Sequence, residues 1–378
     1  MARWSSAHAS RYYHLLMHVA AHGHRIIVVQ PPSRQSTEAN DIDVVLREHS
    51  NVKVITVPIS SAFWNAKFPM EKLLKKLYFT FRSAAMVRRI CKSEQIDLLY
   101  LYNIPQALYL LGCKTRVLFD FADDLMAMLK VELSISEHHL LYRLADAVLG
   151  WMVRRSAVVI CISAPLFDKI DHPHKFIIPN GAGLPADGVG VPRPSTFTVG
   201  YVGAFEYSMD LDLMIAAAER LPQYPFLLIG AGRDFARIKE SVERKRLANV
   251  ELTGALSHDE AMRLLSGMDV CLNLFHKTEV SHAVSPLKLF EYLMRSKPAI
   301  STRLKEVERI DEHFLYYADT VDEVVERIEY IAAHRTEARA MAEHGKDVVL
   351  KKFSWDTIAC DFLQAVSASP KKESEIAV

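Results

Sequence analysis

The segment VSPLKLFEYLM, residues 284–294, holds the residues whose types and spacing best suggest chemistry. Ser285 is a good N-cap and Pro286 suits the first helical position, so we predict a helix that starts here. The free N–H groups and positive dipole end of such a start attract anions, for example a diphosphate. Lys288 would add a full positive charge, and Glu291 could accept hydrogen bonds from ribose hydroxyls. The alternative is a capped amphipathic helix with a surface Lys–Glu pair.

A second group of reactive side chains follows the apolar run RVLFDF, residues 116–121. Asp120, Asp123 and Asp124 would stand at the carboxyl end of a strand, where ligands of open α/β sheets bind. A carboxylate there could orient an acceptor hydroxyl or stabilise an oxocarbenium-like transition state. Such acids could instead cap the next helix. We take Asp120 and Asp123 as candidate catalytic residues, leave both interpretations open for Asp120, and favour the cap for Asp124.

Histidines at helical spacing raise the question of a metal. His14, His18 and His22 are spaced by four and would share one helix face. No companion carboxylate motif accompanies them, and no histidine follows the three aspartates at ligand spacing. We therefore predict no metal and no bound cofactor.

The stretch from residue 64 to 92 is strongly basic in an otherwise neutral chain. It carries one acid, Glu71, and five interleaved aromatic residues. Its eight basic residues are Lys67, Lys72, Lys75, Lys76, Arg82, Arg88, Arg89 and Lys92. A basic, aromatic helix of this kind can lie on an anionic bilayer. A solvated helix face with aromatic residues packed inward is the equal alternative, and nucleic acid is not expected without a second basic patch.

The elements that would position these residues can be predicted from the sequence, in which short apolar runs alternate with helix-length segments. Runs that are apolar on both faces predict parallel sheets covered on both sides, built from βαβ units. The fold class is thus α/β, with two doubly wound, Rossmann-like domains. The predicted strands are 25–30, 52–58, 97–102, 116–121, 157–162, 175–179, 197–203, 225–230, 249–254, 269–275, 298–302 and 314–317.

Composition shifts suggest the domain boundaries. The stretch 180–196 is rich in Gly and Pro and reads as a linker between domains at 1–182 and 197–350. A C-terminal helix over 351–368 and a disordered tail over 369–378 follow. A first helix over about 9–22 has no strand before it. We expect the first strand to be encoded upstream of this Met, the alternative being a sheet without that strand.

Composition sets the class of protein. The 378 residues exceed one ordinary core, 50% are apolar, and the net charge is +1. The five cysteines show neither disulfide nor zinc spacing, no run is long enough to span a bilayer, and no signal peptide precedes the first helix. We predict a cytoplasmic protein.

The segment SPLKLFEYLMRSKPAIST resembles the P-x-K-x-x-E-Y-x-x-x-G-x-P-V-V signature of retaining glycosyltransferase family 4, the group 1 glycosyltransferases. The resemblance is strong over about 197–366 and weaker before it. It implies the GT-B fold, in which two Rossmann-like domains face a central cleft. The supporting segments are VGYVGAFEYSMDLDLMIAAAERLP, LLIGAGRD, VELTGALSHDEAMRLLSGMDVCL and FSWDTIACDFL, with AHGHRIIVV, DFADDL, CISAPLFDKI and IPNGAG in the first half.

The resemblance also implies roles for individual residues. Glu291 would hold the donor ribose, whereas Ala283 stands where the family has its first acid. The loop 203–210 lacks the usual cation, so Lys288 would do more to neutralise the diphosphate, without a metal. The base would lie by residues 254–256, where Gly230 and Gly232 would allow close backbone approach, although these two glycines could instead be ordinary turn residues. The implied donor site comprises Gly203, Gly254, Leu256, Ser285, Pro286, Leu287, Lys288 and Glu291. His282 and Val284 would lie near the sugar, although we favour a solvated loop position for His282. From the charge of the basic stretch, we take Lys72, Lys75, Lys76 and Arg82 as a candidate acceptor or membrane patch.

The resemblance implies a hexosyltransferase that uses a UDP- or GDP-sugar and a saccharide or lipid-linked acceptor, with retention, in polysaccharide or glycolipid biosynthesis. Its place would be the cytoplasm, at the inner face of an anionic membrane. Two alternatives stay open. One is a UDP-sugar epimerase of the same fold, and the other is a catalytically weak nucleotide-sugar-binding scaffold, which the missing acid at Ala283 suggests.

Overall fold

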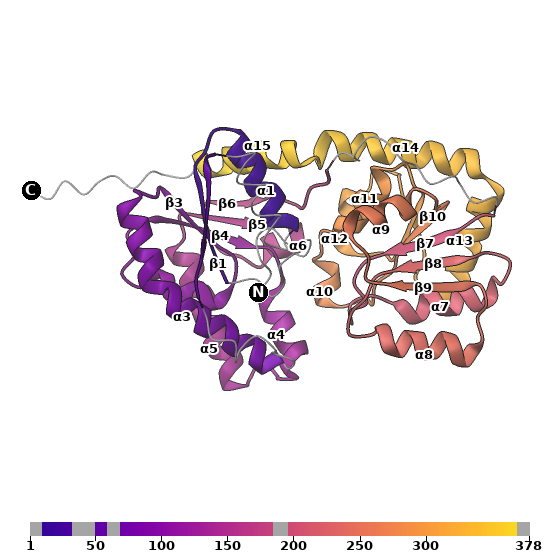
Figure 1. Cartoon of the computed structure of the whole chain (residues 1–378), viewed down its shortest axis with the longest axis horizontal. Helices are drawn as coiled ribbons and strands as arrows, with labels where there is room; N and C mark the ends of the chain where they lie inside the picture. The colour runs from indigo at the N-terminus through magenta and orange to yellow at the C-terminus, as the bar shows by residue number, and fades with distance from the viewer. Residues whose placement is uncertain (1–9, 32–49, 59–68, 184–195, 369–378) are drawn as a thin grey trace, which may run out of the picture. The chain divides into compact units, whose positions relative to one another are not determined.

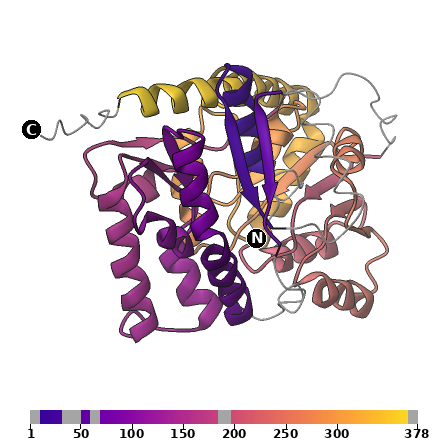
Figure 2. The same ribbon diagram turned by 60° about the vertical axis from the view of Figure 1, so that its left-hand side comes forward.

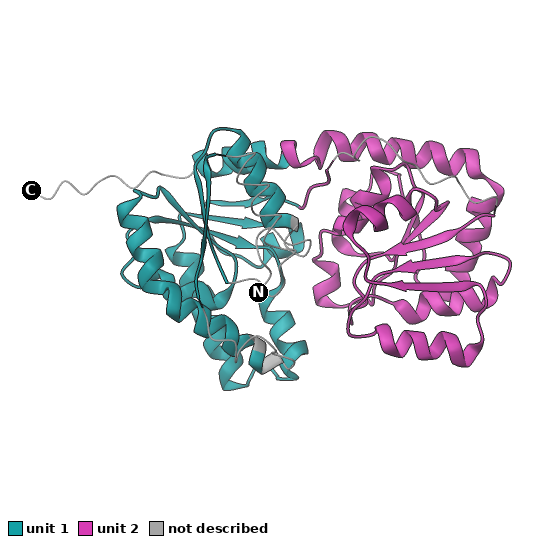
Figure 3. Ribbon diagram, viewed as in Figure 1, with its two compact units in different colours: residues 1–179, 358–378 teal, residues 180–357 magenta. Residues whose placement is uncertain are grey.

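The computed structural model describes residues 10–31, 50–58, 69–183 and 196–368. The chain forms two compact units (Figure 3). Unit 1 consists of residues 1–179 and 358–378, and unit 2 consists of residues 180–357. Each unit is a parallel β-sheet structure, and in the described residues helices connect most successive strands (Figure 1).

Unit 1 contains two parallel sheets. One has the order β3-β4-β5-β6, and the other pairs β1 with β2, which run side by side in Figure 2. The elements of unit 1 are α1 (Ser10–Ala21), β1 (Ile26–Gln30), β2 (Val52–Thr56), α3 (Pro69–Ser93), β3 (Leu98–Leu101), η3 (Ile104–Leu110), β4 (Arg116–Phe121), α4 (Leu125–Leu133), α5 (Leu140–Arg155), β5 (Val158–Cys161), α6 (Ala164–Asp168), β6 (Lys175–Ile177) and most of α15 (Trp355–Ala368).

The central strands of unit 1 are buried on both faces, which explains their apolar runs. All residues of β5 are buried, as are all of β4 except Arg116. Residues 1–9 lie outside the described part of the chain, and so does the prediction about a strand before α1.

The last helix, α15, packs on the four-stranded sheet of unit 1. Arg116 Nη2 donates a hydrogen bond to the carbonyl oxygen of Val366 at 3.2 Å, and the rings of Tyr100 and Phe362 have centroids 6.3 Å apart. The two ends of the chain therefore contribute to one unit.

Unit 2 has one six-stranded parallel sheet with the order β12-β11-β10-β7-β8-β9. On its helical layers, α7 contacts α8 and α13, and α11 contacts α14. The elements of unit 2 are β7 (Val199–Val202), α7 (Leu211–Arg220), β8 (Phe226–Ile229), α8 (Phe235–Lys245), β9 (Val250–Gly254), α9 (His258–Leu265), β10 (Val270–Asn273), α10 (Glu279–His282), α11 (Leu287–Leu293), β11 (Ala299–Ser301), α12 (Lys305–Ile310), β12 (Tyr316–Tyr317), α13 (Val321–Ala333) and α14 (Arg335–Lys352).

The strand order locates a ligand site in unit 2. The chain builds outward from β7 in one direction through β8 and β9, and then returns to β10 on the other side of β7. The carboxyl ends of β7 and β10 thus form a topological switch point, where open α/β sheets bind ligands. All twelve predicted strands are present in the two units, and the predicted α/β parallel-sheet fold is confirmed.

Candidate functional site

Two loops meet at the switch point of unit 2. The loop 203–210 follows β7, and the residues after β10 run alongside it. Asp210 N donates to Leu274 O at 3.1 Å, and His276 N donates to Ser208 O at 3.0 Å. These backbone bonds fix the rim over which a ligand of this sheet would lie.

Glycines let the loop after β7 pack tightly on the end of β8. A Cβ built on Gly230 would lie 1.8 Å from the carbonyl oxygen of Gly203, and one on Gly232 would lie 2.3 Å from that of Phe205. No side chain fits at such distances. Gly230 and Gly232 are therefore needed for the packing of two loops, while a close approach to a bound base stays a prediction.

Helix α11 is anchored to the same rim through Tyr292. The buried Tyr292 hydroxyl accepts a hydrogen bond from Val202 N at 3.0 Å and donates to Val202 O at 3.1 Å. On the same helix, the ring of Phe290 stacks on Phe353 with centroids 4.8 Å apart. These contacts hold the first turn of α11 beside the end of β7.

The predicted start of α11 is wrong by one residue. Pro286, not Ser285, is the N-cap, and Leu287 is the first helical residue. The Ser285 hydroxyl accepts a hydrogen bond from Asn180 N at 3.1 Å, and Ser285 O accepts one from Asn180 Nδ2 at 2.7 Å. Because Asn180 takes both groups, the serine fixes the chain after β6 instead of capping the helix.

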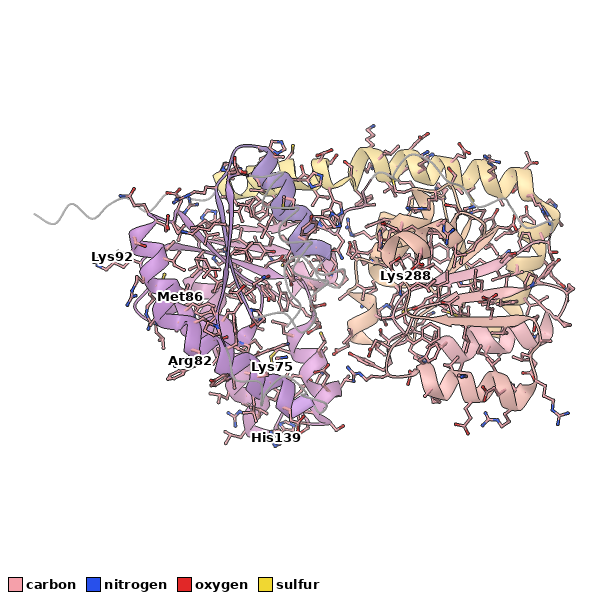
Figure 4. The ribbon with its side chains drawn as sticks, in the orientation of Figure 1. Lys75, Arg82, Met86, Lys92, His139 and Lys288 are labelled. Carbon is pink, nitrogen blue, oxygen red and sulfur yellow. The ribbon has the colours of Figure 1, made fainter. Side chains whose placement is uncertain are left out.

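Lys288 projects from the first turn of α11 into the loop after β7 (Figure 4). Its Nζ lies 2.9 Å from Met209 Sδ, and it lies over the rings of Tyr201 and Phe275, 5.2 and 4.8 Å from their centroids. Within the described part of the chain, Lys288 forms no salt bridge. Desolvation lowers the pKa of this half-buried lysine to about 7, although the charge of Glu291 opposes the shift.

The surroundings of Lys288 were missed by the sequence reasoning. Met209 belongs to a loop that we noted only for its lack of cations, and Tyr201 and Phe275 were assigned to strands as core residues. Their common position at strand ends on either side of the switch point is the signal that would have found them.

Glu291 is half-buried one turn after Lys288. Desolvation raises the pKa of this carboxyl, while the charges of His258, Arg295 and Lys288 act against the shift. The predicted pair of one cation and one carboxylate is thus present on one helix face, and it lies at the switch point.

The other predicted donor-site residues lie around this rim or near it. Gly254, with φ of +75°, ends β9 and accepts a hydrogen bond from Gly230 N at 3.1 Å, and Leu256 follows it with an exposed side chain. His282 and Val284 were expected near the sugar. In the structure, His282 accepts a hydrogen bond from Lys305 N at 3.3 Å, and Val284 packs against the core.

In unit 1, Asp120 is the centre of a buried ion pair. Arg11 donates to both of its carboxylate oxygens, from Nε at 2.9 Å and from Nη2 at 3.2 Å, and the Tyr100 hydroxyl donates to it as well. Arg11 also donates to the carbonyl oxygens of Ile178 and Pro179, each at 2.9 Å. Asp120 therefore ties α1 to β4 and to the segment after β6. Nothing in the sequence pattern around Arg11 had indicated this pairing.

Asp123 and Asp124 follow with different environments. Asp124 caps α4, because its side chain accepts a hydrogen bond from Ala127 N at 3.0 Å, as predicted. Asp123 is exposed to solvent on one side, yet desolvation by the surrounding protein and then the charge of Asp120 raise its pKa to about 6. An exposed carboxylate that titrates near neutral pH suits a general base.

The predicted basic patch lies on α3. Lys75 and Lys76 are half-buried, Arg82 is exposed, and the side chain of Lys72 lies outside the described part of the chain. Figure 4 shows Lys75, Arg82 and Lys92 spread along this helix. Lys76 lies close enough to Asp123 for its charge to lower the pKa of that carboxyl, against the desolvation that raises it.

Two kinds of site are absent from the described residues. No group of three or more His, Cys, Asp or Glu side chains there is arranged to hold a metal ion. In the same residues, no helix combines the length and the apolar character needed to cross a bilayer.

Known proteins resemble this chain in sequence. A family model described as "Glycosyl transferase-like" matches residues 212–364. The putative teichuronic acid biosynthesis glycosyltransferase TuaH of Bacillus subtilis is 28% identical over 118 residues, which are 31% of this chain and 30% of that protein. The uncharacterized glycosyltransferase MJ1178 of Methanocaldococcus jannaschii is 26% identical over 308 residues, 76% of this chain and 80% of the relative.

Solved structures resemble it in fold. HepE (Alr3699) of Anabaena, solved in complex with UDP and glucose, superposes with a TM-score of 0.65 at 15% identity, over 91% of this chain and all of that one (100%). The matches favour transfer over the epimerase and scaffold alternatives. The two parallel-sheet units and the superposition on HepE show the GT-B fold, and the sequence matches support a glycosyltransferase enzyme.

Proposed function

We propose that the protein moves a hexose from a UDP-sugar to a saccharide or lipid-linked acceptor, with retention of the anomeric configuration, in polysaccharide or glycolipid assembly. The choice of UDP over GDP is supported by the UDP found in HepE, and the pathway by the name of TuaH. In the reaction the acceptor hydroxyl bonds to the anomeric carbon, the bond from that carbon to the β-phosphate oxygen breaks, and UDP leaves with the electron pair.

One observation carries the proposal: the Lys288 amine at the switch point rests on a sulfur atom and two ring faces instead of a carboxylate. A diphosphate would supply the missing negative charge. Since the charge of the leaving UDP grows as its bond to the sugar breaks, Lys288 would stabilise the transition state more than the bound substrate.

The remaining donor contacts follow from the same rim. Glu291, one turn along α11, is proposed to accept hydrogen bonds from the ribose. The first-turn amides of Leu287 and Lys288, which a helix start leaves without intrahelical acceptors, would donate to the diphosphate. Gly203 and Gly254 would flank the nucleotide, with the exposed Leu256 against the base.

Asp123 is the proposed acceptor base. Its solvent access and a pKa near 6 suit removal of the proton from the acceptor hydroxyl as the new bond forms. Asp120, with both oxygens bonded to Arg11, is proposed to act on Asp123 only through its charge. We place the reaction in the cytoplasm, at an anionic membrane face. The five free cysteines suit a reducing compartment, and the basic residues of α3 suit that surface.

Nucleotide binding by two variants tests this function. Calorimetric titration with UDP should show at least about tenfold weaker binding for Lys288→Met, the loss of one charge-assisted contact. Glu291→Gln should weaken binding of UDP but not of inorganic diphosphate, because its proposed partner is the ribose. Lys239→Met, which removes an exposed lysine on α8, is the matched control and should bind UDP like the parent protein.

A turnover assay completes the test. With UDP-hexoses and GDP-hexoses as donors, UDP should be released only when an acceptor is present. If Lys288→Met and the parent protein bound UDP with equal affinity, the proposal of a donor site at Lys288 in unit 2 would be wrong. Conversion of a UDP-sugar to its epimer without acceptor would replace the transferase proposal.

A further inference from the structure

Unit 1 contains a large apolar cavity that the donor chemistry does not use. Its volume is about 750 Å³, and its walls come from α3, η3, α4 and α5. The lining is mainly leucine, with Met128, Val148 and Trp151 from α4 and α5. Protein interiors hold few voids larger than a water molecule. This volume falls instead in the range of small-molecule sites, roughly 300–1,000 Å³.

The mouth of the cavity continues as exposed apolar surface. Leu77, Leu111 and Leu144 line the cavity and are also exposed, by 38%, 56% and 59%. On α3, Phe81 stands one turn beyond Leu77 and is 72% exposed. Leaving such side chains in water is unfavourable, so the mouth suits a partner that is itself apolar.

The charged side chains of the lining are mainly positive. Lys75 and Lys76 line it together with a single acid, Glu132. Leu125, which also lines the cavity, follows Asp123 and Asp124 directly. The hydrocarbon-lined space therefore has two lysines in its wall, and its lining is continuous in the chain with the proposed acceptor base.

We propose that this cavity binds the hydrocarbon chain of the acceptor, an amphiphile with an anionic head group that Lys75 and Lys76 contact beside Asp123. An apolar chain matches the walls, and the excess of two cations over one acid matches an anionic head. The inference rests on the proposed function and narrows its acceptor to a lipid with a negatively charged head.

Alkyl phosphates test the cavity directly. Octyl, decyl, dodecyl and tetradecyl phosphate, each below its micelle-forming concentration, should bind with affinity that rises about fourfold per methylene until the cavity is full. Trp151, in the cavity wall, reports the binding through its fluorescence. A brominated dodecyl phosphate should quench that signal in the parent protein, and Trp151→Phe should lose the quenchable component. Equal affinity along the series, or no binding, overturns the proposal.

Two pairs of variants test whether the hydrocarbon chain of the ligand lies in the cavity. Ala145→Phe fills the cavity from α5 and should weaken dodecyl phosphate at least about tenfold, the equivalent of roughly two methylenes. Its matched control is Ala147→Phe, on an exposed position of α5 outside the lining. Leu144→Ser at the mouth should weaken binding as well, whereas Leu140→Ser, 80% exposed and outside the lining, should not. The Leu144 pair keeps the test valid if Ala145→Phe does not fold.

The head group is tested by comparing dodecyl phosphate with the uncharged dodecyl maltoside. Lys75→Gln with Lys76→Gln should weaken only the phosphate, and Lys92→Gln, at the other end of α3, should weaken neither (Figure 4). Binding to anionic vesicles that Ala145→Phe leaves unchanged, without alkyl phosphate binding, would mean surface docking only and overturn the cavity proposal.

The nucleotide assay separates this inference from the proposed function. If UDP binds in a Lys288-dependent way but the alkyl series shows no chain-length dependence, only the lipid inference fails. If alkyl phosphates bind as expected but UDP does not bind, the inferred cavity stands as a lipid site and the transferase proposal fails.

Discussion

At Lys288, the arrangement that suits the proposed diphosphate binding lowers the stability of the fold. A charged amine on a sulfur atom and two aromatic rings loses hydration that no carboxylate replaces in the described structure. The folded chain tolerates this unfavourable arrangement because the rim around it is fixed by Tyr292 and by the backbone bonds between the two loops. Removing the amine should therefore stabilise the fold.

We expect Lys288→Met to be more stable than the parent protein by about 1–2 kcal/mol at pH 6, once the solvent contact of the half-buried side chain is allowed for. The folded-state pKa of about 7 lies below the ordinary 10.5, so between these values the unfolded chain holds a proton that the folded chain has lost. Stability of the parent protein thus rises with pH over that window, and the advantage of the variant shrinks.

Urea unfolding at pH 6 and pH 9.5 measures this difference, with Lys239→Met as the control for loss of an exposed lysine. An advantage of the same size at both pH values would contradict the assigned cause.

At the residue scale, the sequence identified which side chains carry charge but not what surrounds them. Lys288 and Glu291 could be read from one short motif, since both lie on one helix. Met209 lies 79 positions from Lys288, and Arg11 lies 109 positions from Asp120. No local pattern encodes such contacts, because they arise only when the sheet order brings distant loops together.

At the scale of elements, strands were easier to predict than helix ends. Every predicted strand is present. The central strands β4, β5, β7 and β10 are buried on both faces, which leaves a continuous apolar run in the sequence. The start of α11 depended instead on a tertiary contact. Asn180, more than 100 positions away, takes the Ser285 groups that would have capped the helix.

We expect Gly230→Ala to lower stability by about 3 kcal/mol and to weaken UDP binding, because the new methyl group would displace the Gly203 carbonyl and with it the loop over β8. Gly23→Ala is the matched control. Gly23 also has a positive φ, +85°, but nothing lies within 4 Å of its Cβ position. It should lose only the stability due to backbone strain and should bind UDP normally, as unfolding and titration together would reveal. UDP affinity unchanged in Gly230→Ala would exclude the loop from the donor site.

At the scale of the whole molecule, the two units carry different parts of the proposed chemistry. Composition predicted a boundary in the Gly- and Pro-rich stretch 180–196, and the units divide after Pro179. The cavity of unit 1 could not be predicted, because a leucine-rich helix face reads as core until the structure shows a space beside it.

Hydrogen exchange followed by mass spectrometry tests this division of labour. UDP should slow exchange in residues 203–210 and in α11, and dodecyl phosphate should slow it in α3 and α5, because ligands stabilise the segments that they contact. Lys288→Met should lose only the first effect and Ala145→Phe only the second. If UDP slowed hydrogen exchange only in α3 and α5, the nucleotide would bind to unit 1, and the proposed donor site in unit 2 would be wrong.

The packing of α15 on the sheet of unit 1 has a consequence for biosynthesis. Arg116 and Tyr100 meet their partners Val366 and Phe362 only when those later residues have left the ribosome. Unit 2, continuous from residue 180 to 357, can fold while residues 358–368 of α15 are still being translated, whereas unit 1 must wait with part of its sheet uncovered. The half of the protein that is made first is therefore completed last.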